Sequence, residues 1–319
     1  MLPELKDARR FAAAGSVVML APMLVLPGPA GGRHPAWTRV TATPVTTTRV
    51  VVAAQLQSVP AGTRVVVTAP GGTRLGSART ASDGRALVPV TTRPHASIRL
   101  VVHARGVSDA VHVSAKTTTK AVRSSRWMIV NKHIGIGRYA PKRLGSSHSA
   151  TLDRRVLRSW NAMVRAAARD GIALWSASSY RSYDSQRSLF GAYAASDGAS
   201  DAQTFSARPG HSEHQTGLAL DVASGECTVR ACFAHTRAGR WVAAHAAAYG
   251  FVVRYPEGEQ QVTGYIYEPW HLRYVGPWLA GYLRSSHTKT LEQAFGLPAA
   301  PSYPTASAVS APMRSPLHR

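Results

Sequence analysis

Residues 212–221 read Ser-Glu-His-Gln-Thr-Gly-Leu-Ala-Leu-Asp, and residues 268–271 read Glu-Pro-Trp-His. A catalytic zinc ion takes three protein ligands and keeps one position for water, and both His nitrogen and carboxylate oxygen serve as its ligands. His214, Asp221 and His271 supply that number of ligands. The two segments together therefore predict a metal centre.

Glu268 adds a carboxylate that the metal does not need. Metal-bound water becomes a nucleophile near neutral pH, and a nearby carboxylate can take its proton and pass it to a leaving amine. A His and an Asp at this spacing are a weak signal in a chain with thirteen His. The linked Ser212, Gly217 and Ala219, with the distant Glu-Pro-Trp-His, make the pattern specific. The pattern predicts the site of a hydrolase.

These motifs resemble those of the VanY-type D-alanyl-D-alanine carboxypeptidases. These zinc peptidases carry Ser-x-His-x-x-Gly-x-Ala-x-Asp and, about fifty residues later, Glu-x-Trp-His. The resemblance extends over roughly residues 127–284, about half of the chain. Further matching segments are 177–186 (Ala-Ser-Ser-Tyr-Arg-Ser-Tyr-Asp-Ser-Gln), 206–210 (Ser-Ala-Arg-Pro-Gly), 249–256 (Tyr-Gly-Phe-Val-Val-Arg-Tyr-Pro) and 273–276 (Arg-Tyr-Val-Gly).

The resemblance implies a role for each matching residue. His214, Asp221 and His271 would bind zinc, and Glu268 would be the general base. Arg181 would stabilise the oxyanion, a task that suits a fixed, planar, permanently charged guanidinium. The residues implied as contacts to the substrate's terminal carboxylate or backbone are Ser212, Gln186 and Tyr180.

Structural alternatives stay open for several of these residues. Arg181 could be an ion-pair partner, Ser212 a turn or cap residue, and Gln186 a solvated helix residue. Trp270 is expected to pack rather than to act in catalysis. His211, beside the motif, is expected to line the cleft or face solvent rather than to bind the metal.

Length and charge set the context. A chain of 319 residues exceeds one ordinary domain, so two domains with tails are expected. The net charge of +22 favours polyanionic partners, such as anionic wall polymers or a membrane surface. No motif for specific nucleic-acid recognition is present. A compositional bias toward Arg and Ala would explain the charge equally well.

The N-terminus predicts export. Lys6, Arg9 and Arg10 precede an apolar run over residues 11–26, and small residues and prolines follow. This order is typical of a secretory signal, so residues 1–32 are predicted to be a signal peptide or an N-terminal anchor. The expected location is extracellular, in the cell wall or membrane-anchored facing outward.

The two cysteines agree with export. Cys227 and Cys232 are the only cysteines, and they follow closely after Asp221. In an oxidising compartment two close thiols form a disulfide, with free thiols as the alternative.

The remaining pattern divides the chain. Short β-branched runs separated by turn residues over residues 49–115 predict a small all-β sandwich, and residues 80–90 resemble a bacterial Ig-like domain. The resemblance gives the catalytic part, residues 127–285, an α+β zinc peptidase fold of the hedgehog/DD-peptidase type, with a helix expected over 152–169. The other segments are a linker at 33–48, a basic linker at 116–126 and a disordered tail rich in Ala, Pro and Ser at 286–319.

Two functions of different class follow. In the first, the protein is an exported zinc carboxypeptidase that removes the terminal D-Ala from peptidoglycan stem peptides. A related wall dipeptidase or endopeptidase is a variant of this hypothesis. In the second, the protein is a non-catalytic module that binds the cell wall. Glu268 and Arg181 favour the enzyme, because a binding module needs neither.

Overall fold

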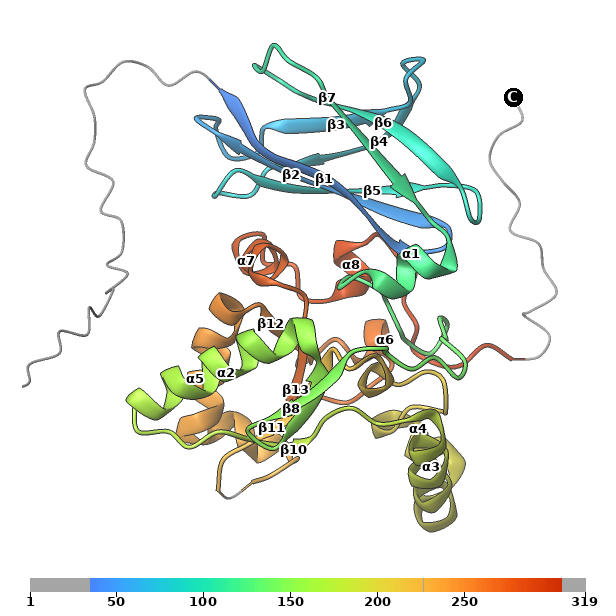
Figure 1. Ribbon diagram of the computed structural model, residues 1–319, viewed down its shortest axis with the longest axis vertical. Coiled ribbons are helices and arrows are strands. Elements are labelled where there is room, and N and C mark those ends of the chain that lie inside the picture. Colours follow the sequence, from blue (N-terminus) through green and yellow to red (C-terminus); the bar gives the residue numbers. More distant parts are fainter. Residues whose placement is uncertain (1–34, 226, 306–319) are drawn as a thin grey trace, which may run out of the picture. The chain divides into compact units, whose positions relative to one another are not determined.

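The computed structural model describes residues 35–225 and 227–305 (Figure 1). The predicted signal peptide or anchor at residues 1–32 lies outside this range, as do residues 306–319. Among the described residues, no helix combines the length and apolar character needed to cross a bilayer.

The N-terminal part is a sandwich of two antiparallel sheets, as predicted. One sheet has the strand order β1-β2-β5 and the other the order β4-β3-β6-β7. Val50, Val52 and Val88 of the first sheet meet Val65 and Val102 of the second in one fully buried core. The strands are β1 (Ala36–Thr46), β2 (Arg49–Gln57), β3 (Arg64–Thr68), β4 (Arg74–Arg79), β5 (Arg85–Thr91), β6 (Ser97–Ala104) and β7 (Val111–Lys116).

The predicted linker at 33–48 is wrong for most of its length, because residues 36–46 form strand β1. This segment is rich in Thr and Val, which favour extended backbone. Trp37 and Val40 pack against the sandwich core, and the strand pairs with β2 along its length. Thr and Pro content alone therefore misidentified an edge strand as a linker.

The predicted basic linker at 116–126 also contains structure. Helix α1 (Thr119–Ser124) begins after Thr118, whose side chain accepts a hydrogen bond from the backbone N–H of Ala121. Val122 is buried on this helix and packs with Met128 and Val130. The connection between the sandwich and the catalytic part is thus packed.

The catalytic part is α+β, as predicted. Its central antiparallel sheet has the order β10-β11-β13-β12, and helix α2 covers it with Val156, Trp160 and Met163, which are fully buried. The elements up to the ligand motif are β8 (Leu144–Ser147), β9 (Ala150–Asp153), α2 (Arg154–Arg169), β10 (Trp175–Ser178), α3 (Tyr183–Asp197) and α4 (Ala199–Phe205). Those that follow are the 3₁₀ turn η1 (Glu213–Thr216), β11 (Ala219–Ala223), η2 (Ala231–His235), α5 (Arg237–His245), η3 (Ala246–Tyr249), β12 (Phe251–Tyr255), α6 (Gln260–Thr263), β13 (Glu268–Tyr274), α7 (Pro277–Ser285) and α8 (Leu291–Ala294).

The predicted disordered tail is wrong for residues 286–305. Helix α8 starts with a capping box formed by Thr290 and Gln293. Leu291 and Phe295 are buried in a cluster with Trp127 and Leu279. A few widely spaced apolar residues, such as Leu291 and Phe295, are enough to fix a segment whose sequence has little regular periodicity.

Candidate metal centre

Two neighbouring strands and one turn bring the three predicted ligands together. Asp221 of β11 pairs directly with His271 of β13 in the antiparallel ladder. His214 lies in η1, which ends at Gly217 with a φ of 68° before the chain enters β11. A Cβ atom at Gly217 would lie 3.0 Å from the backbone nitrogen of Asp153, so both conformation and space require glycine. The motif spacing thus reflects one tight turn followed by one strand.

The ligand atoms face a common point. Nε2 of His214 lies 3.4 Å from Oδ2 of Asp221, and Nδ1 of His271 lies 3.4 Å from Oδ1 of Asp221. The candidate ligand atoms of the three residues all lie within 4.8 Å of one another. Nδ1 of His214 donates to the carbonyl of Ser179 at 2.7 Å, which leaves Nε2 available to a metal.

The site fits a zinc ion. Oδ1 of Asp221 is buried and has no hydrogen-bond partner in the described part of the chain. A buried carboxylate oxygen without a partner is costly, and a cation would satisfy it. Two imidazoles and one carboxylate form the donor set of a catalytic zinc site. His214, Asp221 and His271 thus lie together in an arrangement that suits a zinc ion.

Burial and neighbouring charge tune these groups. Burial lowers the pKa of His214. For Asp221, burial opposes ionisation, but His214 and His271 hold its pKa below the ordinary value. Burial also opposes protonation of His271, but the neighbouring carboxylates of Glu213 and Glu268 raise its pKa to about 9. The buried acids around His271 thus favour a positive charge at this position.

Glu268 lies beside the three candidate ligands and does not belong to their group. Its Oε2 atom lies 3.4 Å from Nδ1 of His271, and the side chain is buried. Burial raises the pKa of Glu268 above its ordinary value. A carboxylate with a raised pKa next to the metal position is suited to accept and return a proton.

Arg181 points into the same pocket, held by two hydrogen bonds. It donates to Oε1 of Gln186 at 2.8 Å and to Oγ of Ser178 at 2.7 Å. No carboxylate of the described residues forms an ion pair with it, so the ion-pair alternative is not supported. The guanidinium is fixed where it could donate to a substrate oxygen.

Two of the three predicted substrate contacts do not line the pocket. Gln186 is fully buried, and its amide is used by Arg181 and by the carbonyl of Ala207. It is neither a solvated helix residue nor a wall of the pocket, and it positions Arg181. Tyr180 does not line the pocket either. Ser212 does line it, and its side chain does not cap η1.

The pocket over the ligands has a volume of about 320 Å³. Its walls beyond the ligands are largely aromatic and aliphatic, which suits a short peptide with few charges. These wall residues are Leu189, Tyr193, Phe205, Val229, Tyr255, Tyr265, Ile266 and Trp270. Trp270 also packs in the core of the catalytic part, as expected.

The predicted disulfide is present. Cys227 and Cys232 are bonded, and they close a loop that includes Val229, one of the pocket walls. His211 lies outside the ligand group. Its Nδ1 atom contacts the carbonyl of Asn131 at 2.8 Å, and its ring packs edge-on against Tyr303.

The sequence did not predict a set of buried charged residues behind the candidate ligands. They are fully or almost fully buried and joined by hydrogen bonds: Glu213, Arg254, Arg273 and Glu292. The available signal was an arginine inside each of two apolar strands, Phe-Val-Val-Arg-Tyr and Trp-His-Leu-Arg-Tyr. A buried arginine needs a buried acid, but the pattern does not say which one.

The fold and the three-residue candidate metal centre together are typical of a peptidase. The family model for VanY, D-alanyl-D-alanine carboxypeptidase, matches residues 149–277. The putative carboxypeptidase YodJ of Bacillus subtilis is 38% identical over 180 residues, which are 52% of this chain and 66% of YodJ. The bifunctional D-Ala-D-Ala dipeptidase and D-Ala-D-Ala carboxypeptidase VanXYC of Enterococcus gallinarum is 37% identical over 136 residues, 41% of this chain and 70% of that protein.

A solved structure agrees with these relatives. The LdcB LD-carboxypeptidase is 34% identical, covers 55% of this chain and 87% of its own, and superposes with a TM-score of 0.51. The chain belongs to the VanY family of D-alanyl-D-alanine carboxypeptidases. His214, Asp221 and His271 are the residues that would hold a metal ion, and two imidazoles with one carboxylate suit zinc.

Proposed function

We propose that the protein is an exported zinc metallopeptidase that hydrolyses the terminal D-Ala from peptidoglycan stem peptides ending in D-Ala-D-Ala. The observation that carries this proposal is the buried group of His214, Asp221 and His271, with Glu268 beside it and outside it. Three ligands and a separate carboxylate are what hydrolysis of an amide needs. Membership of the VanY family supports the substrate class.

Each residue has a definable task in this reaction. Zinc, when bound, polarises the scissile carbonyl and lowers the pKa of a water molecule. Glu268 takes the proton of the attacking water and delivers it to the amine of the departing D-Ala. Arg181 donates to the carbonyl oxygen as it gains negative charge. Gln186 and Ser178 keep the guanidinium of Arg181 in place.

A related wall peptidase is the closest alternative. The relatives include a dipeptidase that is also a carboxypeptidase, and a similar solved structure is an LD-carboxypeptidase. The pocket of about 320 Å³ accommodates a terminal residue with its neighbour. The non-catalytic alternative is disfavoured, because a binding module would need neither a buried Glu268 beside the candidate ligands nor Arg181 held at the pocket.

The test is a product analysis with three substrates. The full chain is incubated with a stem peptide ending in D-Ala-D-Ala, with its product ending in a single D-Ala, and with the dipeptide D-Ala-D-Ala. We expect release of one D-Ala from the first substrate, loss of this activity with a chelator, and recovery with added zinc. Cleavage of only the second or only the third substrate would show that the proposed substrate is wrong and that the protein is a different wall peptidase. No cleavage of any of the three would favour the non-catalytic binding module.

Export is part of the proposal. The charged and apolar N-terminal pattern supports it, and so does the Cys227–Cys232 disulfide, since structural disulfides persist in oxidising compartments. Cell fractionation with an activity assay tests it. Activity confined to the cytoplasm would contradict it.

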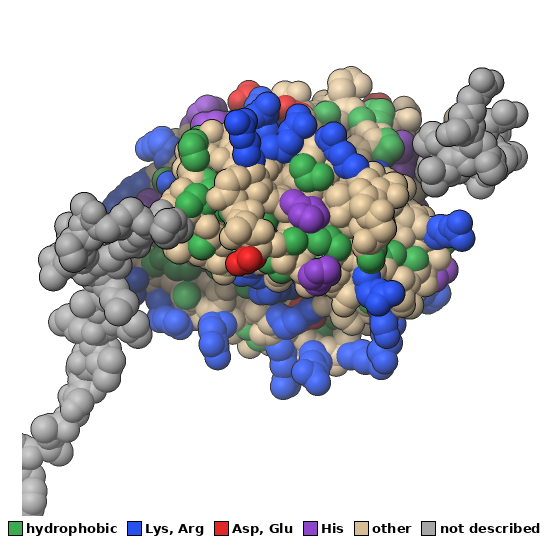
Figure 2. Space-filling view, turned by 90° about the horizontal axis from the view of Figure 1, so that it is seen from above, with side chains coloured by type: hydrophobic (Ala, Val, Ile, Leu, Met, Phe, Trp, Pro, Cys, Tyr) green, Lys and Arg blue, Asp and Glu red, His purple; other side chains and the backbone are tan. Residues whose placement is uncertain are grey.

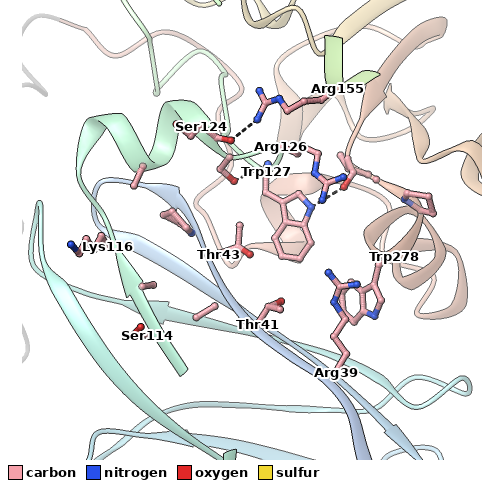
Figure 3. Close-up of a pocket in the computed structure, with 18 residues that line it drawn as sticks. Arg39, Thr41, Thr43, Ser114, Lys116, Ser124, Arg126, Trp127, Arg155 and Trp278 are labelled. Atoms are coloured by element: carbon pink, nitrogen blue, oxygen red, sulfur yellow. Dashed lines mark hydrogen bonds between the residues drawn. The ribbon is translucent and has the colours of Figure 1, made fainter. Parts of the chain in front are cut away.

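We also propose that an anionic wall polymer binds in a basic cleft between the sandwich and the catalytic part. On the face shown in Figure 2, Lys and Arg side chains outnumber Asp and Glu. A cleft of about 700 Å³ is lined by Arg39, Lys116 and Arg126, and by Arg155, which is ion-paired with Asp153 (Figure 3). Trp278 adds an aromatic surface, with Arg39 5.8 Å from its ring centroid. Phosphate groups along a polyol polymer match this combination.

The cleft is tested by sedimentation with a polyol-phosphate polymer at low and high salt. We expect the double change Arg39→Gln and Arg126→Gln to weaken binding several-fold more than the matched change Arg165→Gln and Arg169→Gln, which removes two exposed charges from α2. Equal losses would mean that binding follows net charge alone. Equal binding of a nucleic acid would mean that the cleft does not select wall polymers.

A further inference from the structure

The two ring nitrogens of His271 have different surroundings. Nδ1 faces Oδ1 of Asp221 and Oε2 of Glu268, each at 3.4 Å, so this nitrogen faces the metal position. Nε2 faces the opposite way, toward Oε2 of Glu213 at 3.9 Å. Both Nε2 of His271 and Oε2 of Glu213 are buried, and neither has a hydrogen-bond partner within the described ranges. Two buried polar atoms without partners thus face each other.

Glu213 is held in a fixed position as a charged acceptor. Its other oxygen, Oε1, accepts hydrogen bonds from Nε of Arg254 at 2.8 Å and from a terminal nitrogen of Arg273 at 2.6 Å. These two guanidiniums compensate the charge of the buried carboxylate. Only Oε2 remains to accept from a further donor, and the donor that it faces is His271.

The C-terminal segment completes this arrangement. Glu292 of α8 accepts two hydrogen bonds from Arg254, at 2.7 and 2.9 Å, and one from the amide of Asn131 at 3.0 Å. Two glutamates and two arginines therefore balance in charge within a region of almost no exposure. Without Glu292, Arg254 would keep a full charge with only half of its compensation, which is costly in a buried site.

We propose that Glu213 is the positioning residue of His271, and that Glu292 of the C-terminal segment holds it in place through Arg254. Oε2 of Glu213 accepts a hydrogen bond from Nε2–H of His271 and thereby reserves Nδ1 for zinc. This inference rests on the proposed function, because it assumes that His271 is a zinc ligand.

The geometry needs only a small adjustment. A hydrogen bond of about 2.9 Å requires the two atoms to approach by about 1 Å, which a rotation of the imidazole can supply when zinc takes Nδ1. The two ligand imidazoles then use opposite nitrogens. His214 binds through Nε2 with the carbonyl of Ser179 as its outer partner, and His271 binds through Nδ1 with a carboxylate. A carboxylate partner fixes the ring and makes its ligand nitrogen more basic.

The experiment measures zinc affinity by competition with a chelator, on the full chain. Glu213→Gln keeps the shape and removes the charge, and we expect zinc affinity to fall by about 10- to 100-fold. Glu292→Gln should lower affinity in the same direction by less, because it acts through Arg254. The control is Glu257→Gln, which changes an exposed glutamate and should leave affinity unchanged. Unchanged affinity in folded Glu213→Gln would overturn the proposal.

A second measurement does not depend on whether the variants fold. In the zinc-loaded wild-type protein, ¹⁵N NMR of the imidazoles should show His271 as the Nε2–H form and His214 as the Nδ1–H form. A His271 that binds through Nε2 would overturn the proposal. The proposed function can fail separately: tight zinc binding with the expected imidazole forms, but no peptide cleavage, would leave the role of Glu213 intact.

Discussion

Strands β13 and β2 are both buried on both faces, but only one of them carries chemistry. In β13, Trp270 and Leu272 point into the apolar core, while His271 and Arg273 point to buried acids. In β2, alternate residues enter two apolar clusters. Val50, Val52 and Ala54 lie in the sandwich core, and Val51 and Ala53 pack with residues of the catalytic part.

This difference distinguishes a strand face that serves function from a joining face, which is a strand face that packs the sandwich against the catalytic part. Burying apolar side chains stabilises a fold directly, whereas buried charges must be paired and often gain nothing over apolar residues. Stability therefore does not explain the buried charged residues of β13, whereas the candidate metal centre does. The outer face of β2 is apolar, and stability alone explains its burial, because it packs the sandwich against the catalytic part.

The largest expected effect is on the charged face of β13. His271→Ala removes one of three ligands, so zinc and activity should both be lost, with kcat/KM reduced by more than about 1,000-fold. Zinc content by mass spectrometry and peptide hydrolysis are measured on the same sample. Full activity in a zinc-free variant would show that this face has another role.

Glu268→Gln separates chemistry from metal binding on the same strand. We expect zinc to remain bound, because Glu268 lies outside the ligand group, while kcat falls by about 100-fold or more through loss of the base. Zinc content and kcat are compared with those of the wild type. Loss of zinc together with activity would make Glu268 a ligand and not a base.

Arg181→Lys should have a smaller effect. A lysine keeps the charge but loses the fork that Gln186 and Ser178 hold, so we expect kcat to fall by about 10- to 100-fold with zinc retained. Arg187→Lys on the exposed side of α3 is the matched control and should leave kcat unchanged. Equal rates for both variants would remove Arg181 from the oxyanion role.

The sequence predicted the ligand centre well because its residues are local to two motifs. Ser212 to Asp221 is one turn and one strand, and Glu268 to His271 lies on the neighbouring strand. The sandwich was predictable for a similar reason, since turn residues separate its β-branched runs.

The sequence did not predict what depends on distant partners. Glu292 meets Arg254 across 38 positions and Asn131 across 161, and no spacing rule connects them. Composition suggested disorder for residues 286–305, although Phe295 fills a cluster with Trp127 and Leu279. Gln186 was assigned to the substrate because a motif shows which residues recur together but not which of them faces the pocket.

The smallest expected effect on activity lies on the joining face of the sandwich. Leu87 of β5 is buried in the cluster that β2 and β5 share with Trp127 and Leu279. Leu87→Ala should lower the free energy of unfolding by about 2–5 kcal/mol, the usual range for a buried leucine. Hydrolysis of a soluble stem peptide should stay unchanged, because no residue of this cluster lines the catalytic pocket.

Leu75→Ala is the matched control, because Leu75 is 38% exposed on β4 and should cost little. Denaturant unfolding and peptide hydrolysis are measured on both variants. If Leu87→Ala slowed hydrolysis while the protein remained folded, the joining face would contribute to catalysis, and the contrast with β13 would fail. A cavity in a shared core lowers the free energy of unfolding. If Leu87→Ala changed neither measurement, Leu87 would therefore not pack the sandwich against the catalytic part.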